Sequence, residues 1–479
     1  MSLKQKTAHG FFWSATERFT VQGLQFVLGI ILARLLLPTD YGLIGMLAIF
    51  LAISQVFIDS GFTSALIQKK DRNDTDYSTA FYFNLIIGVL FYLILYFGAP
   101  LIADFYKAPI LDPLTKLIGL SILINSLAIV QRAKLTVKLD FKTQAKASLT
   151  SVFISGIIGI YLAYNGYGAW ALATQIITKS TINTILLWFL SKWKPQFIFS
   201  RESFKALFSF GSKLLIAGLL YTIYGNLYLI IIGKIFNAGS LGYYTRAQQF
   251  QRVPTENITA VIQRVTFPVL SSIQDDNVRL LKAFRGFIRQ STFIIFPITI
   301  GLAILAEPLI SLLLTDKWLP AVPMLQLLCL VGILYPLHAV NLNIINVKGR
   351  SDIFLRLEII KTITISIAIV CTYSFGIKIM IIGRLIASLI TLFITTLYTN
   401  KMVNYSSFKQ FKDILPIMGI AAFMAVIIWF SIQVVSTDIT KILVGLISGI
   451  IAYVVAAKIG RFEELKQIYG IIITKLPWK

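Results

Sequence analysis

Long apolar segments recur from one end of the chain to the other. An α-helix of about 20 mostly apolar residues is long enough to cross the hydrocarbon core of a bilayer. Charges, prolines and glycine-rich turns divide the chain into about fourteen such segments. We therefore predict an all-α polytopic membrane protein with about 14 transmembrane helices. The predicted centres are Phe26, Phe50, Val89, Leu123, Ile157, Ile176, Leu220, Val253, Thr299, Gly332, Ile367, Leu389, Val426 and Ile447.

The composition excludes a soluble multidomain enzyme. Of 479 residues, 57% are hydrophobic and only 14% are charged, whereas soluble domains contain about 25% charged residues. The net charge of +23 could suggest nucleic acid as a partner, but the bases are spread among apolar segments. We therefore expect the lipid bilayer, and no nucleic acid, as the partner of this charge.

The distribution of basic residues predicts the orientation, because cytoplasmic loops are enriched in Lys and Arg. With fourteen spans, both termini and the even-numbered connections contain 29 of the 44 basic residues, and the opposite side contains five. We predict a multi-pass protein of the cytoplasmic (inner) membrane with both termini in the cytoplasm. The weakest predicted span, from about Leu241 to Leu270, is kept because the charge alternation and an internal repeat both require it.

The repeat has an offset of about 200 residues. Residues 31–42 resemble residues 231–242, each with an apolar pair, a small residue, a base, a polar turn and a glycine. Pro100 and Pro308 match at offset 208, and Gly166 and Gly376 match at offset 210. Each copy would contain six helices, so we predict two six-helix halves related by a parallel pseudo-twofold axis that enclose a central cavity. The predicted divisions are 1–200, 201–405, and 406–479 with two extra helices and a cytoplasmic tail.

Motifs for enzymatic chemistry are missing from the sequence. It has no Walker A pattern, zincin motif, nucleophile elbow or dinucleotide-binding glycine signature. The cysteines, Cys329 and Cys371, lie in apolar stretches that offer neither a zinc spacing nor a disulfide framework. We expect no enzyme, no metal and no cofactor.

Four short motifs resemble the bacterial polysaccharide flippases. They are the run from Gln25 to Leu43 with Ala33, Arg34, Pro38, Asp40 and Gly42, the run from Phe57 to Gln68 with Asp59 and Gly61, and the runs Gln131–Ala133 and Gly166–Gln175. The chain is similar to the capsule, colanic-acid and O-antigen exporters of the multidrug/oligosaccharidyl-lipid/polysaccharide transporter superfamily. The match is best over residues 10–180.

The resemblance implies a flippase that moves an undecaprenyl-pyrophosphate-linked oligosaccharide across the membrane by alternating access. Such a protein would serve capsule, lipopolysaccharide or other cell-surface polysaccharide biosynthesis, next to glycosyltransferases and a polysaccharide polymerase. No covalent bond changes in this step, so no catalytic residue is required. Arg and Lys side chains suit a pyrophosphate group.

Charged residues within the predicted spans are the candidate site residues, because a charge at bilayer depth should face protein or water. Ten bases and four acids fall there. The candidate cavity cations are Arg18, Lys179, Lys213, Arg246, Arg252 and Arg264. The acids, for ion coupling or helix pairing, are Glu17, Asp59, Glu256 and Glu358. Spacing alone allows Arg252 to pair with Glu256, and Glu358 with Lys361.

Two other functions are open to such a chain. A drug or small-cation antiporter of the same superfamily would need an acidic cavity, whereas bases outnumber acids in these spans by ten to four. A polytopic polysaccharide polymerase or ligase would usually display a large outer loop, whereas the predicted outer connections are short. The flippase is therefore the favoured prediction.

Overall fold

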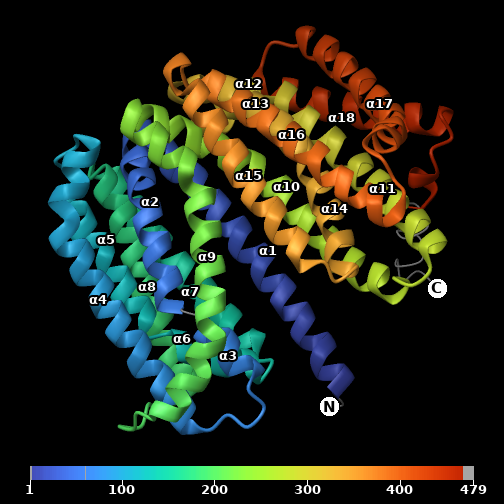
Figure 1. Cartoon of the computed structure of the whole chain (residues 1–479). Coiled ribbons are helices and arrows are strands. Elements are labelled where there is room, and N and C mark those ends of the chain that lie inside the picture. Colours follow the sequence, from blue (N-terminus) through green and yellow to red (C-terminus); the bar gives the residue numbers. More distant parts are fainter. Residues whose placement is uncertain (1–2, 60, 468–479) are drawn as a thin grey trace. The chain divides into compact units, whose positions relative to one another are not determined.

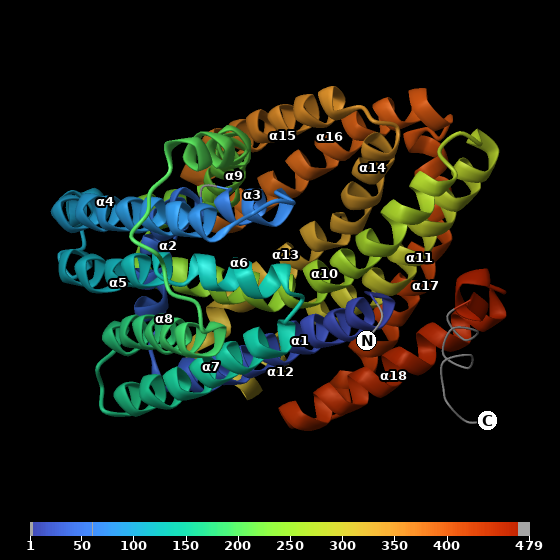
Figure 2. The same ribbon diagram turned by 90° about the horizontal axis from the view of Figure 1, so that it is seen from below.

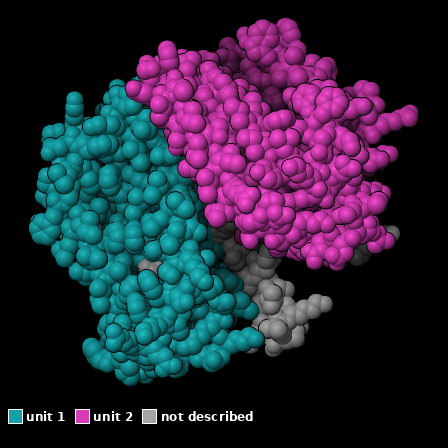
Figure 3. Space-filling model, viewed as in Figure 1, with its two compact units in different colours: residues 1–242 teal, residues 243–479 magenta. Residues whose placement is uncertain are grey.

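The computed structural model describes residues 3–59 and 61–467, and within the first eighteen residues it describes the side chains of Trp13, Thr16 and Glu17 only. Throughout these ranges the regular structure is helical and contains no strand (Figure 1). Contacts divide the chain into two compact units, unit 1 with residues 1–242 and unit 2 with residues 243–479 (Figure 3).

Unit 1 is built from nine helices and the first residues of a tenth. They are α1 (Leu3–Leu35), α2 (Pro38–Asp59), α3 (Phe62–Gln68), α4 (Asp74–Tyr106), α5 (Leu111–Ser126), α6 (Ile129–Val137), α7 (Phe141–Tyr164), α8 (Ala169–Ser191), α9 (Arg201–Ile235) and the start of α10 (Ala238–Ser272).

Unit 2 contains the rest of α10 and eight further α-helices. They are α11 (Asn277–Ile304), α12 (Ala306–Leu314), α13 (Val322–Ile333), α14 (Tyr335–Val347), α15 (Ser351–Thr372), α16 (Ile377–Val403), α17 (Ser407–Gln433) and α18 (Asp438–Ile459). Two 3₁₀ turns, Asp316–Ala321 and Tyr373–Phe375, precede α13 and α16.

All fourteen predicted span centres lie inside helices. Ten helical segments of the described chain are long and apolar enough to cross a membrane, which confirms an all-helical chain with many candidate spans. The helices around the other four centres do not combine the length and apolar character needed to be counted with these ten. The apolar part of α1 is the shorter stretch Phe19–Leu35, and polar or charged side chains interrupt α8, α10 and α15. The count of fourteen stays a prediction.

Two of the predicted spans are broken helices. The span centred on Leu123 consists of α5 and α6, and the span centred on Gly332 consists of α13 and α14. Pro336 stands in the first turn of α14, where a missing backbone N–H costs least. Polar backbone at such breaks is tolerated in a bilayer only where protein or water surrounds it.

The order of helix ends repeats along the chain. Helix α1 ends at Leu35 and α2 begins at Pro38, and 200 residues later α9 ends at Ile235 and α10 begins at Ala238. Gly166 and Gly376, which precede α8 and α16, both have positive φ angles of 80° and 95°, a conformation that favours glycine. These local equivalences agree with the repeat found in the sequence.

The two matched turns also touch each other within unit 1. A Cβ atom added to Gly42 would overlap the backbone carbonyl of Ala238, and one added to Gly242 would overlap the backbone carbonyl of Pro38. The first turns of α2 and α10 thus cross reciprocally at two glycines. Close backbone approach at small residues is a common packing mode of membrane helices.

The boundary between the two contact units, after Gly242, does not coincide with the predicted division between residues 200 and 201. Helix α9 packs against α2, α3 and α4, so its contacts place it in unit 1. The divisions at 200/201 and 405/406 follow the repeat in the sequence rather than contacts, and they stay predictions. Helices α17 and α18 pack against each other and against α11 in unit 2.

We predict that Gly42→Ala and Gly242→Ala each destabilise the protein by about 1–3 kcal/mol, the usual cost of overfilling a packed site. The matched control is Gly98→Ala in α4, where an added Cβ meets nothing within 4 Å and removing a helical glycine should be neutral or slightly stabilising. Thermal unfolding in nanodiscs measures both. Equal unfolding temperatures for Gly42→Ala and Gly98→Ala would contradict the close crossing.

Candidate functional site

A cluster of polar and charged side chains joins four helices of unit 1. Glu17 of α1 accepts a hydrogen bond from the Ser148 hydroxyl of α7 at 2.9 Å. Arg132 of α6 interacts electrostatically with Glu17 and also with Lys179 of α8. We call these four residues the α1–α8 cluster.

Close packing of α1 on α7 positions the acid. Gly156 of α7 lies against the Leu28 side chain, and a Cβ at that position would approach the Leu28 side chain to 2.5 Å. Since the small residue lets the two helices approach, Glu17 reaches Ser148. In hydrocarbon a carboxylate without such a partner would be costly.

The cluster has a net positive charge. Arg132 and Lys179 are exposed, whereas Glu17 is partly buried. Lys179 makes no hydrogen bond or ion pair with another described residue, so its ammonium group keeps all three donors for a ligand. Two cations next to one carboxylate give a site that can attract an anion.

The sequence indicates two members of this cluster, Lys179 and Glu17, as candidate site residues, but not Arg132. Arg132 follows an apolar segment directly, so it falls among the bases of a predicted cytoplasmic connection. The structure places it in α6, the short helix after the break in the predicted fourth span. The motif Gln131–Ala133 was the only sequence signal for it.

Lys213 lies elsewhere in unit 1, on the exposed surface of α9. It makes no hydrogen bond or ion pair with the described residues. Arg18 belongs to α1, but its side chain lies outside the described residues. Its role as a cavity cation therefore stays a prediction.

In unit 2, three candidate bases lie along α10 in different surroundings. Arg252 is paired with Glu256 at 2.6 Å, with both side chains more than one-third exposed. Arg246 donates to the Gln249 side chain at 2.6 Å. Arg264 is exposed. The intrahelical pairing that the spacing of Arg252 and Glu256 allows is thus present.

A further base of unit 2 approaches α10 from another helix. Arg384 of α16 donates to the hydroxyl of Tyr244 at 2.8 Å, and Tyr244 is fully buried. Tyr244 lies two residues before Arg246, near the start of α10. No spacing rule links Arg384 to a residue 140 positions earlier, so this contact is not predictable from the sequence.

The remaining acids are bound locally. Asp59, at the end of α2, accepts a hydrogen bond from the Thr63 hydroxyl at 2.7 Å. Glu358 and Lys361 form the predicted pair within α15 at 3.6 Å. The structure therefore places Glu17 and Lys179 each near Arg132, pairs Arg252 with Glu256, and leaves Asp59 and Glu358 at separate places.

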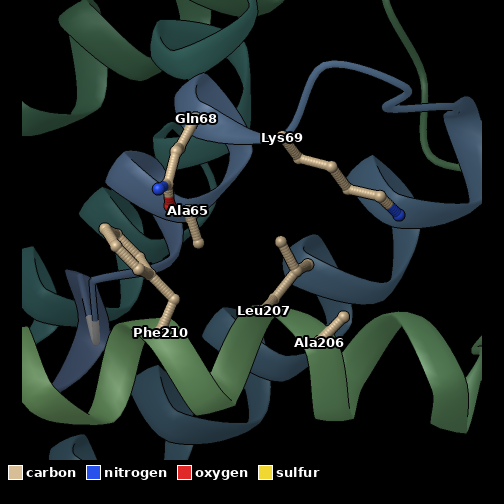
Figure 4. A pocket seen from close by; sticks show the side chains of 6 residues that line it. All are labelled: Ala65, Gln68, Lys69, Ala206, Leu207 and Phe210. Atoms are coloured by element: carbon tan, nitrogen blue, oxygen red, sulfur yellow. The ribbon is translucent and has the colours of Figure 1, made fainter.

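One small cavity lies between α3 and α9 in unit 1 (Figure 4). Its volume is about 270 Å³, and its lining is Ala65, Gln68, Lys69, Ala206, Leu207 and Phe210. Lys69 extends away from the other lining side chains in the figure, and its ammonium group is bound to the buried Asp76 at 2.7 Å. This cavity lies below the usual size of ligand sites, so we do not assign the cargo to it.

Among the described residues, no group of three or more His, Cys, Asp and Glu side chains could hold a metal ion. His338 of α14 bonds instead to the Ser388 hydroxyl of α16 at 3.0 Å. The charged groups of the candidate site are therefore mainly cations with polar neighbours.

The fold is similar to that of helical membrane proteins of known structure. The lipid II flippase MurJ has a solved structure with a TM-score of 0.77, at 16% identity, which covers 94% of this chain and 98% of that one. A multidrug resistance MATE family transporter reaches a TM-score of 0.61 at 15% identity, over 80% of this chain and 94% of the other. At such identities the likeness concerns the fold alone.

The family is shown by the sequence itself. The model of a family described as "Polysaccharide biosynthesis protein" matches residues 31–323, and the chain belongs to this family. The resemblance to polysaccharide flippases is thereby confirmed.

Three relatives are similar over about two thirds or more of their length. The teichuronic acid biosynthesis protein TuaB of Bacillus subtilis is 29% identical over 74% of this chain and 73% of its own. The lipopolysaccharide biosynthesis protein WzxC of Escherichia coli is 27% identical over 86% of this chain and 84% of its own. The transport protein ExoT of Rhizobium meliloti, for succinoglycan biosynthesis, is 28% identical over 68% of this chain and 66% of its own.

We predict that the α1–α8 cluster binds pyrophosphate. Lys179→Gln should weaken the binding about tenfold or more, because a hydrogen bond to a charged group contributes about 1.5–3 kcal/mol. Lys179→Arg should retain most of the affinity, and Glu17→Gln should increase it by removing the only acid of the cluster. Calorimetry on the protein in nanodiscs measures all three.

Lys378→Gln is the matched control, since Lys378 is also exposed but lies at the start of α16. An affinity of Lys179→Gln equal to that of Lys378→Gln would show that the cluster is not the anion site.

Proposed function

We propose that this protein is a flippase that translocates undecaprenyl-pyrophosphate-linked oligosaccharide repeat units across the cytoplasmic membrane. It would act in the biosynthesis of a cell-surface polysaccharide such as capsule or O-antigen. The main support is membership of a polysaccharide biosynthesis family by a chain with many candidate membrane spans. The relatives TuaB, WzxC and ExoT are named for the biosynthesis of teichuronic acid, lipopolysaccharide and succinoglycan.

The cargo has three parts that need different surroundings. The pyrophosphate is anionic, the sugar chain is polar, and the lipid tail is apolar. Cations held at bilayer depth can bind the pyrophosphate, with Lys as a point charge and Arg through paired donors. The tail stays in the bilayer while the head group crosses, so the protein never has to enclose the whole molecule.

The proposed binding residues are Arg18, Lys179, Lys213, Arg246, Arg252 and Arg264. The surroundings of these residues suggest that they contribute unequally to binding of the pyrophosphate. Lys179 and Lys213 are exposed and make no ion pair with a described residue, whereas Arg252 is already neutralised by Glu256. We therefore assign the smaller share to Arg252.

Translocation would proceed by alternating access. We propose fourteen spans, made of two six-helix halves with a parallel pseudo-twofold axis and two further helices. Repeats of this kind allow one half to rock against the other around a central site. Both termini would be cytoplasmic, where most of the basic residues would then lie. Glycosyltransferases would supply the cargo, and a polymerase would consume it.

A cation-coupled antiporter of the same superfamily is the second candidate, and a polysaccharide polymerase or ligase is the third. An antiporter for cationic drugs requires acids that are available to the ligand. The candidate acids Glu256 and Glu358 are in ion pairs, and Glu17 and Asp59 accept hydrogen bonds. The homologues with named functions point to polysaccharide biosynthesis rather than to drug export.

The double variant Arg18→Ala/Arg246→Ala tests the flippase function. We expect surface polysaccharide to fall at least tenfold in cells, because two charge-assisted contacts to the pyrophosphate would be lost. Membrane insertion, measured by the amount of protein in the membrane fraction, should be unchanged. Lys378→Ala removes a charge near the start of α16 and serves as the control.

Normal surface polysaccharide from the double variant would contradict the assignment of these residues. Normal polysaccharide from a strain that lacks the protein altogether, and lacks any second copy, would contradict the function itself. Accumulation of lipid-linked oligosaccharide in the cytoplasmic leaflet of that strain is the result that supports it.

A further inference from the structure

The segment between α8 and α9 is fixed to the beginning of α4. The Trp193 indole N–H donates to Asp74 at 3.1 Å. The backbone N–H of Gln196 donates to the Ser78 hydroxyl at 2.9 Å, and that of Ser200 donates to the Thr79 hydroxyl at 3.0 Å. Figure 2 shows this segment as the green chain that runs from α8 across α4 to α9. We call residues 192–200 the strap.

The outer side of the strap is apolar. Phe197 is 98% exposed, and its neighbours Ile198 and Phe199 are 47% and 52% exposed. The Phe197 ring faces the Tyr82 ring with centroids 6.4 Å apart, and the Phe199 ring lies 6.0 Å from the Phe204 ring. Three consecutive large apolar side chains held in such exposure are unfavourable in water, so this surface calls for an apolar environment.

Basic residues flank the apolar residues on both sides. Lys192 and Lys194 precede them, and Arg201 and Lys205 follow them at the start of α9; all four side chains are exposed. Glu202 is the single acid between residues 192 and 205. Aromatic and basic side chains side by side are typical of the membrane–water interface, where the bases attract anionic lipid head groups.

The depth of the strap in the bilayer follows from helix geometry. Helix α4 has 33 residues, which corresponds to about 50 Å at about 1.5 Å per residue. It thus exceeds the hydrocarbon core, about 30 Å thick, by roughly 10 Å at each end. Ser78 and Tyr82 lie four and eight residues after Asp74, or about 6–12 Å along the helix. The strap therefore lies at the boundary between head groups and hydrocarbon.

We propose that the strap is an interfacial anchor that binds anionic phospholipids, with its apolar side chains among the upper acyl carbons and its basic side chains at the phosphates. This inference does not depend on the cargo or on the proposed transport. It assigns a lipid site to the connection between the two sequence repeats, on the side that the positive-inside rule places in the cytoplasm.

A probe at the tip of the strap tests the proposal in the full chain. In a Cys329→Ala/Cys371→Ala background, Phe197→Cys is labelled with an environment-sensitive fluorophore in nanodiscs that contain phosphatidylglycerol. We expect severalfold stronger quenching by lipids spin-labelled near the head group than by aqueous iodide. Asp71→Cys, exposed in the turn before α4, is the control and should show the reverse.

The charge contribution is tested without cysteine substitutions. Native mass spectrometry measures how much phosphatidylglycerol, against phosphatidylcholine, remains bound to the original chain and to Lys192→Gln/Lys194→Gln. We expect a loss of preference of roughly fivefold per removed charge, and no loss for Lys107→Gln/Lys378→Gln.

Two results would overturn the anchor. One is iodide quenching at position 197 equal to that at position 71, together with unchanged lipid retention in Lys192→Gln/Lys194→Gln. The other is protection of position 197 that appears only when a cytoplasmic protein is added, which would make the strap a protein interface.

Discussion

The interior of a bilayer accepts a polypeptide only if the chain bonds its own backbone groups. This constraint accounts for the helical structure of the described residues and also for its exceptions. Where α5 meets α6, the N–H of Ala128 turns to the carbonyl of Asn125 at 3.0 Å, and where α13 meets α14, that of Leu334 turns to Val331 at 3.2 Å. Both breaks keep local bonds, so a helix can change direction within a span without orphaned backbone groups.

In the same environment, the cost of a charged side chain depends on whether it has a partner of opposite charge. A charge that is bound on its own helix, as in the Arg252–Glu256 pair, needs no ligand and contributes little to recognition. A base that forms no ion pair with a described acid, such as Lys179, is costly in hydrocarbon unless water or an anion reaches it. Surroundings of this kind distinguish candidate binding residues from structural ones better than position in the sequence does.

The sequence predicts helices well, because each span must be apolar over its whole length. All fourteen centres lie in helices. In both copies of the motif, residues 31–42 and 231–242, one helix ends and the next begins at equivalent positions. Partnerships between distant residues are not predictable in this way. The Arg384–Tyr244 bond and the place of Arg132 beside Glu17 depend on how helices pack. Hydropathy also cannot show that α9 packs on α2, since the apolar character of a helix surface does not specify which helix it contacts.

The predicted repeat has no counterpart for helices α17 and α18, yet they are part of the core of unit 2. Ile417, Met424 and Tyr453 belong to the same buried cluster as Phe284 of α11. The buried amides of Asn341 in α14 and Gln410 in α17 exchange two hydrogen bonds of 3.1 Å each. A satisfied polar network in a low dielectric fixes the register of the helices it joins. Any rearrangement that moves α14 must therefore carry α17 with it, so the two extra helices add mass and rigidity to unit 2 rather than an independent moving part.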